Sequence, residues 1–190
     1  MLNLFAYTGG ATMACASAGA AEVVHVDASK GMVNWAKENM MLSHLENHKI
    51  RFIVDDVLKF VAREKRRGRT YHAIIMDPPS YGRGPNGEIW KIEEQLYPLI
   101  SACMEILDEN PLFFLVNSYT TGFPPTVLYN LLRTTVVKST GMVRLMPEKS
   151  VCPLQPQTVC CHAESMENGL AVSDESIVKI PYELRLHVYE

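Results

Sequence analysis

The sequence predicts an α/β protein built on a doubly wound, mostly parallel sheet. Five apolar runs of four or five residues are each followed by a helical pattern. Strands that are apolar throughout are typical of parallel sheets covered by helices on both faces, and right-handed crossovers make such a sheet doubly wound. The length of 190 residues, with 47% apolar and 21% charged residues, suits a single globular domain.

Each predicted strand ends at a turn signal or directly before a helical pattern. The strands are Met1–Phe5, Val23–Val26, Arg51–Val54, Ala73–Met76 and Leu112–Val116. The helices that follow them are Ala11–Ala18, Lys30–Leu45, Val57–Arg67, Ile92–Leu107 and Thr126–Val137. We expect Gly19 to end the first helix, Ser29 to cap the second and Pro98 to kink or break the fourth.

The pattern weakens beyond Lys138, so we divide the chain into a core over residues 1–140 and a closing segment over residues 141–190. The segment Val151–Ala163 has neither helical nor strand periodicity. Ile177–Ile180 and Leu184–Tyr189, on either side of Pro181, are candidate closing strands.

Ligands of such sheets bind outside the carboxyl ends of the strands, so the residues after each apolar run are candidates for function. The first loop contains Tyr7, Thr8, Gly9 and Gly10. Its glycines allow close approach to a ligand, and the next helix N-terminus offers free N–H groups. A plain tight turn is the alternative, because the loop lacks the GxGxxG fingerprint.

Carboxylates follow the next two runs. Asp27 can accept both hydrogen bonds of a ribose diol, as in sites for NAD and for S-adenosylmethionine. Capping of the following helix is the alternative, although Ser29 can do this instead. Asp56 can accept from an adenine amino group, with the N–H of Val57 nearby, or it can cap the helix that starts there.

The fourth run ends in Asp77, Pro78, Pro79, Ser80 and Tyr81. Proline has no N–H, so a carboxylate beside two prolines makes a pocket of acceptors only. Such a pocket suits an amino group that gives up its protons as it attacks, and Tyr81 can stack on the base carrying it. A rigid loop without chemistry is the alternative.

Methylation at C5 of a pyrimidine needs a cysteine nucleophile instead. The loop after the fifth run, 117–122, contains none, and Cys15 and Cys103 fall on predicted helices. A nitrogen target is therefore favoured over C5.

Five cysteines at irregular spacing indicate a reducing, cytoplasmic setting. The group Cys152, Cys160, Cys161 and His162 matches no zinc-binding spacing, so we predict no metal.

The formal charge of −3 argues against non-specific binding of nucleic acid. The basic run between Lys59 and Arg69 is either a solvated face that complements the helix dipole or an RNA-phosphate contact. No apolar stretch is long enough to span a membrane.

Four segments together resemble class I S-adenosylmethionine-dependent methyltransferases. They are LNLFAYTGGATMACASAGA, HVDASKGMVNWAKEN, IRFIVDDVLKFVAREKRRGRTYHAIIMDPPSYGRG and LVNSYTTG. More narrowly, they are similar to bacterial large-subunit ribosomal RNA methyltransferases with a YTGG loop and a DPPxY/F motif. The resemblance covers roughly residues 1–137 and implies a Rossmann-like fold, S-adenosylmethionine as cofactor and ribosomal RNA as substrate.

The resemblance also implies roles. Tyr7, Thr8, Gly9 and Gly10 would hold the amino-acid part of the cofactor, and Asp27 would bind its ribose. Ser29 and Trp35 would lie near the adenosine, and Asp56 and Val57 would read the adenine. Asp77, Pro78, Pro79 and Tyr81 would form the target pocket. A core position on the second helix is the alternative for Trp35.

Members of this family carry an RNA-binding module before the first strand, so we expect an N-terminal part to be missing here. Two alternatives to an active methyltransferase follow. One is a cofactor-binding fragment without activity. The other is an oxidoreductase that uses NAD(P), against which the absent GxGxxG and the present DPPSY both argue.

Overall fold

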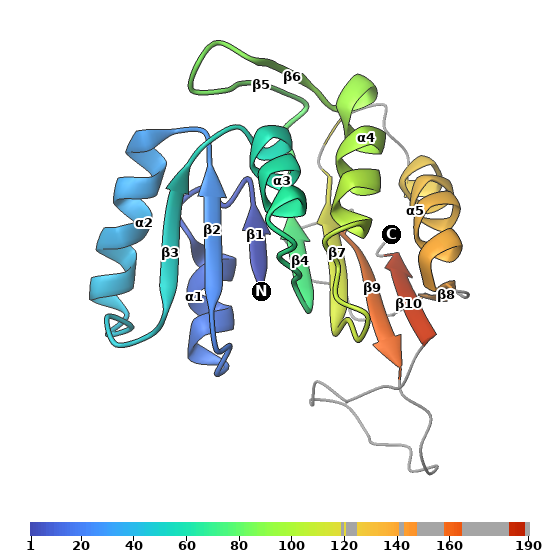
Figure 1. Cartoon of the computed structure of the whole chain (residues 1–190), viewed down its shortest axis with the longest axis horizontal. Coiled ribbons are helices and arrows are strands. Elements are labelled where there is room, and N and C mark those ends of the chain that lie inside the picture. The colour runs from blue at the N-terminus through green and yellow to red at the C-terminus, as the bar shows by residue number, and fades with distance from the viewer. Residues whose placement is uncertain (119, 121–124, 141–142, 148–157, 165–182, 189–190) are drawn as a thin grey trace.

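The computed structural model describes residues 1–118, 120, 125–140, 143–147, 158–164 and 183–188 (Figure 1). Five parallel strands form one part of its main sheet, in the order β3-β2-β1-β4-β7. They are β1 (Leu2–Leu4), β2 (Val23–Asp27), β3 (Ile50–Val54), β4 (Ala73–Met76) and β7 (Phe113–Asn117). Each of the five predicted apolar runs is one of these strands, and the doubly wound α/β fold is confirmed.

Five helices cover the sheet, α1 and α2 on one face and α3, α4 and α5 on the other. They are α1 (Gly10–Ser17), α2 (Lys30–Leu42), α3 (Val57–Arg66), α4 (Ile92–Met104) and α5 (Pro125–Thr140). Alternate strand residues such as Leu4, Val26 and Met76 share one buried cluster with α3, α4 and α5. A smaller cluster under α1 and α2 contains Met13, Ala16 and Val23. Burial on both faces explains why the strands are apolar at every position.

Polar side chains interrupt the core beneath α1. Asn3 of β1 donates to the Thr12 hydroxyl at 2.9 Å, and that oxygen lies 3.0 Å from Nδ1 of His25 on β2. All three side chains are buried, and burial lowers the pKa of His25 to about 4. The imidazole is therefore neutral at pH 7 and is held by the hydroxyl.

Three helices end three residues away from the expected position, the fourth at Met104 rather than Leu107 and the fifth at Thr140 rather than Val137. The second helix ends at Leu42 rather than Leu45, and His44 then takes a left-handed conformation with φ of 54°. The fourth helix continues through Pro98, which lies inside it, although we expected a kink or break there.

A small two-stranded sheet that the sequence analysis did not predict projects above the main sheet (Figure 1). Its antiparallel strands are β5 (Tyr81–Arg83) and β6 (Ile89–Lys91), with Gly82 opposite Trp90. At the turn, the Gly84 N–H donates to the Glu88 carbonyl at 2.8 Å, and Gly87 has φ of +87°. This β5–β6 hairpin connects the end of β4 to α4.

Three further strands complete the eight-stranded sheet in the order β7-β9-β10-β8. They are β8 (Val143–Pro147), β9 (Thr158–Glu164) and β10 (Glu183–Val188). β9 lies antiparallel to both β7 and β10. β10 confirms the strand expected at Leu184–Tyr189, whereas β8 and β9 were not predicted. The candidate strand Ile177–Ile180 lies outside the described residues.

The strand register brings the carboxyl ends of the parallel strands to one level. Leu4 lies opposite both Val26 and Met76, and Asp27 lies opposite Val54. The residues that follow these positions therefore meet along one edge of the sheet, as expected for a parallel α/β fold.

Candidate functional site

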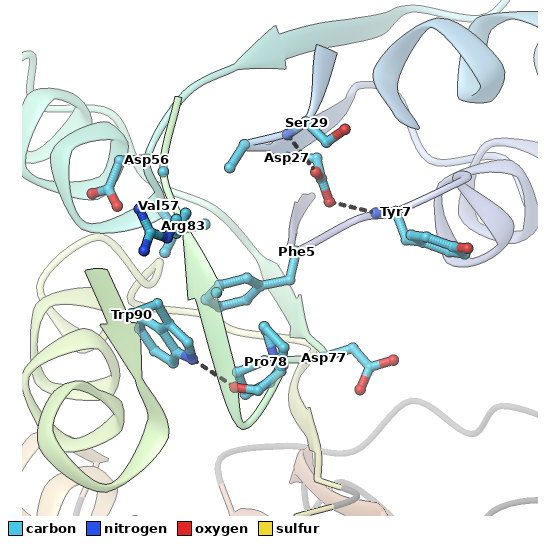
Figure 2. A pocket seen from close by; sticks show the side chains of 14 residues that line it. Phe5, Tyr7, Asp27, Ser29, Asp56, Val57, Asp77, Pro78, Arg83 and Trp90 are labelled. Carbon is cyan, nitrogen blue, oxygen red and sulfur yellow. Dashed lines mark hydrogen bonds between the residues drawn. The ribbon is translucent and has the colours of Figure 1, made fainter. Parts of the chain in front are cut away.

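A pocket of about 420 Å³ opens at this edge of the sheet. Four connections contribute to it: the β1–α1 loop, the β2–α2 loop, the start of α3, and the segment from the end of β4 through the β5–β6 hairpin (Figure 2). The residues lining it are Phe5, Tyr7, Asp27, Ala28, Ser29, Asp56, Val57, Asp77, Pro78, Pro79, Gly82, Arg83, Gly84 and Trp90.

Most of the residues singled out from the sequence meet in this pocket. Those that line it are Tyr7, Asp27, Ser29, Asp56, Val57, Asp77, Pro78 and Pro79. Those that do not are Thr8, Gly9, Gly10, Trp35 and Tyr81. Trp35 is half exposed on α2, so its alternative assignment to the core is wrong, and Tyr81 is exposed at the start of β5.

Asp27, the last residue of β2, ties two loops together. Its Oδ2 accepts from the backbone N–H of Tyr7 at 2.8 Å, and its Oδ1 accepts from the N–H of Ser29 at 2.8 Å (Figure 2). Ser29 caps α2 through its side chain, which accepts from the Met32 N–H at 3.4 Å, as predicted. Each oxygen of Asp27 keeps lone pairs that can accept from a ligand diol.

The β1–α1 loop adopts backbone conformations that are rare for side chains. Phe5 and Tyr7 have φ of 53° and 49°, and Gly9 has φ of 85°. A Cβ at Gly9 would lie 3.1 Å from both Ala36 Cβ and Met13 Cε. Glycine is therefore required at position 9 both for its conformation and for the close packing of α1 against α2.

Asp56 caps α3, because its Oδ1 accepts from the Lys59 N–H at 3.0 Å. The structure thus confirms that Asp56 caps this helix, which the sequence analysis gave as the alternative to an adenine contact. The cap uses one carboxylate oxygen of Asp56. Val57 is the first residue of α3, so its N–H has no acceptor within the helix. Both residues line the pocket, so a carboxylate and a donor N–H come from consecutive positions there.

Asp77 directly follows β4 and is an acceptor without a partner. Its Oδ1 is buried, and no described residue donates to it. Burial raises the pKa of Asp77 to about 6. At the end of the adjacent strand β7, Asn117 also holds a buried side-chain oxygen without a partner among the described residues.

The other acceptors of the DPPS segment are already occupied. The indole N–H of Trp90 donates to the Pro79 carbonyl at 2.6 Å (Figure 2), and the Ile92 N–H donates to the Ser80 carbonyl at 3.1 Å. The Ser80 hydroxyl lies 2.8 Å from that of Thr120. No described residue donates to the Pro78 carbonyl. The Asp77 Oδ1 and the Pro78 carbonyl are thus two acceptors of this segment to which no described residue donates.

Sequence reasoning missed Phe5, Arg83 and Trp90. Phe5 was assigned to the first strand, but it lies just beyond β1 and its ring packs edge-on against Trp90, with centroids 4.7 Å apart. Arg83 and Trp90 belong to the unpredicted hairpin. The dipeptide Asn86-Gly87 between short β-type runs is a hairpin signal that could have indicated it.

The basic run on α3 is largely paired with acids. Lys59 contacts Glu88, Arg63 contacts Asp55, and Lys65 contacts Glu105. A solvated and internally neutralised face fits this geometry better than a phosphate-binding patch. Within the described part of the chain, no helix is long and apolar enough to cross a membrane.

The described residues include no group of three or more histidines, cysteines and carboxylates that could hold a metal ion. That statement does not extend to the candidate cluster at Cys152, Cys160, Cys161 and His162. Residue 152 lies outside the described residues, and only the backbone of the other three is described.

Comparison with known proteins agrees with the geometry. Residues 1–96 match the model of a family described as S-adenosylmethionine-dependent methyltransferase. The chain is 37% identical over 81 residues to ribosomal RNA large subunit methyltransferase I of Cronobacter sakazakii, covering 43% of this chain and 20% of that protein. It is 30% identical over 118 residues to ribosomal RNA large subunit methyltransferase K of Neisseria meningitidis, covering 62% and 33% respectively.

Solved structures show the same likeness. A SAM-dependent methyltransferase from Agrobacterium tumefaciens superposes with a TM-score of 0.70 at 45% identity, covering 71% of this chain and 43% of that one. SMU.776, a methyltransferase solved as a complex with SAH, gives a TM-score of 0.62 at 28% identity, covering 70% and 34%. The matched region is thus less than half the length of each of these relatives.

Proposed function

The chain belongs to the family of S-adenosylmethionine-dependent methyltransferases, and we propose that it methylates a base of ribosomal RNA at an exocyclic nitrogen. The observation that carries this proposal is the pair of acceptors at the pocket, the Asp77 carboxylate, with its buried Oδ1, and the Pro78 carbonyl, to which no described residue donates. The names of the curated relatives support ribosomal RNA as the substrate class.

The pocket has the donors and acceptors that S-adenosylmethionine requires. Asp27 would accept from the ribose hydroxyls while it holds the Tyr7 and Ser29 loops in place. Asp56, through the carboxylate oxygen that its cap does not use, and the N–H of Val57 would read the amino group and a ring nitrogen of the adenine. When bound, the cofactor supplies an electrophilic methyl group on a sulfonium. Thr8, Gly9, Gly10 and Trp35 do not line the pocket, and for them a direct contact rests on the family resemblance alone.

An exocyclic amine on a base is a poor nucleophile because its lone pair is delocalised into the ring. Hydrogen bonds from its two N–H groups to Asp77 and to the Pro78 carbonyl would localise that pair on nitrogen and orient it for attack. As the N–C bond forms and the S–C bond breaks, the nitrogen becomes acidic. Asp77, whose pKa is about 6, would take the proton and pass it to water. Proximity and alignment supply most of the rate enhancement.

Cys103 and Cys15, the two cysteines whose side chains the structure describes, support nitrogen over C5 as the target. Cys103 is completely buried on α4, and burial raises the pKa of its thiol. Cys15 on α1 also has a raised pKa because of burial. Neither thiol forms a thiolate readily at pH 7, and neither lines the pocket, so neither suits the covalent step that C5 methylation needs.

The test uses S-adenosylmethionine with a labelled methyl group and purified ribosomal RNA. We expect label in the RNA with the wild-type chain. Asp77→Ala should transfer less than about one hundredth as much, with an affinity for S-adenosylhomocysteine within about threefold of wild type. Equal loss of transfer and of affinity would contradict the role of Asp77. A thermal shift with NADH but not with S-adenosylhomocysteine would favour an oxidoreductase instead.

A further inference from the structure

Trp90, the central residue of β6, is buried between the two loops that the proposed reaction requires. Its side chain is only 5% exposed although the β5–β6 hairpin around it is mostly exposed. It lines the pocket, as do Pro79 and Phe5, and Figure 2 shows its ring beside that of Phe5. A buried tryptophan on a small exposed hairpin indicates that the hairpin is docked at this residue.

The first contact of Trp90 fixes the target loop. Its indole N–H donates to the Pro79 carbonyl at 2.6 Å, the bond that Figure 2 draws as a dashed line from Trp90. Together with the Ile92 N–H on the Ser80 carbonyl, this bond holds the Pro79–Ser80 and Ser80–Tyr81 peptide groups, which directly follow the peptide group that carries the Pro78 carbonyl. Proline fixes φ on both sides, so little freedom remains for the Pro78 carbonyl.

The second contact joins Trp90 to the cofactor loop. Its ring meets that of Phe5 edge-on, with centroids 4.7 Å apart and planes at 61°. Phe5 lies two residues before Tyr7, whose N–H is bound by Asp27, and both residues have positive φ. Positive φ at a bulky residue is costly and persists only where surrounding contacts hold it. The ring of Trp90 is one such contact.

The hairpin that carries Trp90 is tied to α3 on its other side. Lys59 of α3 forms an ion pair with Glu88, the residue just before β6. The Lys59 ammonium, hydrogen-bonded to this carboxylate, lowers the pKa of Glu88 to about 2. The Glu88 carboxylate also accepts from the Asn86 N–H at 2.9 Å, within the hairpin turn. The contacts of Glu88 with Lys59 and Asn86 therefore hold the hairpin in place against α3 and beside the pocket.

We propose that Trp90 is a positioning residue for methyl transfer. Through its N–H on the Pro79 carbonyl and its ring on Phe5, it holds the Pro78 carbonyl and Asp77 at a fixed position relative to the β1–α1 loop. This inference rests on the proposed function, because it assigns Trp90 a role in that reaction. Trp90 contacts the target loop and acts through Pro78 and Asp77.

The decisive variant is Trp90→Phe, which keeps an aromatic ring beside Phe5 and removes the donor. We expect kcat for RNA methylation to fall by about tenfold or more, because the loss of one buried hydrogen bond to a positioned group is of that order. The dissociation constant of S-adenosylhomocysteine should stay within about threefold of wild type. Benzothienylalanine at position 90, with sulfur in place of the N–H in the same bicyclic ring, should reproduce the kcat loss.

Tyr97→Phe on α4 is the matched control, because it removes a polar hydrogen from an exposed aromatic side chain outside the pocket. It should leave kcat and affinity unchanged. A kcat within about threefold of wild type in Trp90→Phe would overturn the proposal, as would a parallel loss of kcat and cofactor affinity.

A second readout keeps the test independent of activity. The chain has two tryptophans, so Trp35→Phe assigns the indole N–H resonance of Trp90 by nitrogen-edited NMR. We expect this proton to exchange with solvent far more slowly than that of the half-exposed Trp35, and to shift when S-adenosylhomocysteine is added. Exchange as fast as that of Trp35, or no shift on binding, would contradict the proposal. Absence of methyl transfer by the wild-type chain would instead contradict the proposed function.

Discussion

Asp27 and Tyr7 are joined by a 2.8 Å hydrogen bond from the Tyr7 backbone N–H to the Asp27 carboxylate, which links the ends of β1 and β2. The other carboxylate oxygen accepts from Ser29 at 2.8 Å. Asp27 thus organises the two loops that the proposed ribose site needs, in addition to any contact with the cofactor itself.

Replacing Asp27 should therefore weaken cofactor binding through two effects. Asp27→Ala removes the acceptor for the ribose and frees two backbone N–H groups, so we expect affinity for S-adenosylhomocysteine to fall by about tenfold or more in calorimetry. Glu46→Ala is the control, because Glu46 is an exposed acid outside the pocket. An unchanged dissociation constant in Asp27→Ala would argue against the ribose role.

Methyl transfer should depend on the ionisation of Asp77, whose pKa burial raises to about 6. Protonated Asp77 cannot accept fully from the target amine, so the rate should fall as the pH drops through 6 and level off above it. In Asp77→Asn, which has no proton to gain in this range, this inflection should vanish from a single-turnover pH profile. A profile unchanged by Asp77→Asn would assign the inflection to another group.

The stability of the fold should also depend on the ionisation of Asp77, but it should favour the protonated carboxyl, whereas methyl transfer favours the carboxylate. Because the folded-state pKa of Asp77 lies above its ordinary value of 3.8, folding favours the protonated carboxyl. That stabilising contribution is complete below pH 3.8 and is lost as the pH rises through about 6. Asp77→Asn should therefore melt at a higher temperature than wild type at pH 8, with a smaller difference at pH 4. A difference that is constant with pH would contradict the raised pKa.

Comparing alanine substitutions at Gly9 and Gly19 separates two costs of adding a Cβ: the strain of a positive φ, which both positions share, and the contact with neighbouring atoms, which only Gly9 has. Both have strongly positive φ, 85° and 89°, but a Cβ at Gly19 would meet nothing within 4 Å. Gly19→Ala should cost about 1–2 kcal/mol of unfolding free energy from conformation alone. Gly9→Ala should cost more in urea unfolding, and only Gly9→Ala should reduce cofactor affinity. An equal loss of unfolding free energy in the two variants would show that the side chains around Gly9 move aside for a Cβ without cost.

The buried network of Asn3, Thr12 and His25 should be sensitive to loss of its central hydroxyl. Thr12→Val keeps the shape but leaves Nδ2 of Asn3 and Nδ1 of His25 without this partner, so we expect a loss of about 1–3 kcal/mol. Thr134→Val, at an exposed position on α5, should cost far less. Similar small changes in both variants would show that the network contributes little.

The parallel strands could be predicted from the sequence because each is a short apolar run with a helix behind it. The range Ala73–Met76 agrees with β4 at both ends. The strand register then brought Asp27, Asp56 and Asp77 together, which follows from parallel pairing alone. The last strands β8 and β9 were missed because their segments lack a clear alternation or apolar run.

The site was only partly predictable because several of its contacts depend on tertiary packing. No local pattern shows that Phe5 leaves β1 with positive φ and packs against Trp90, 85 positions further along the chain in the β5–β6 hairpin. Helix amphipathicity likewise could not decide whether Trp35 is buried, and the structure leaves it half exposed. Side chains on loops are the hardest to place from the sequence, because loops have no repeating pattern of apolar residues.

Mass spectrometry of nucleosides tests the central claim most directly. Ribosomal RNA would be incubated with the chain and S-adenosylmethionine carrying a deuterated methyl group, then digested to nucleosides. We expect the label in a nucleoside methylated on an exocyclic nitrogen, and we expect this label to be lost with Asp77→Ala. Label in 5-methylcytidine, or unlabelled RNA from a chain that binds S-adenosylhomocysteine, would contradict it.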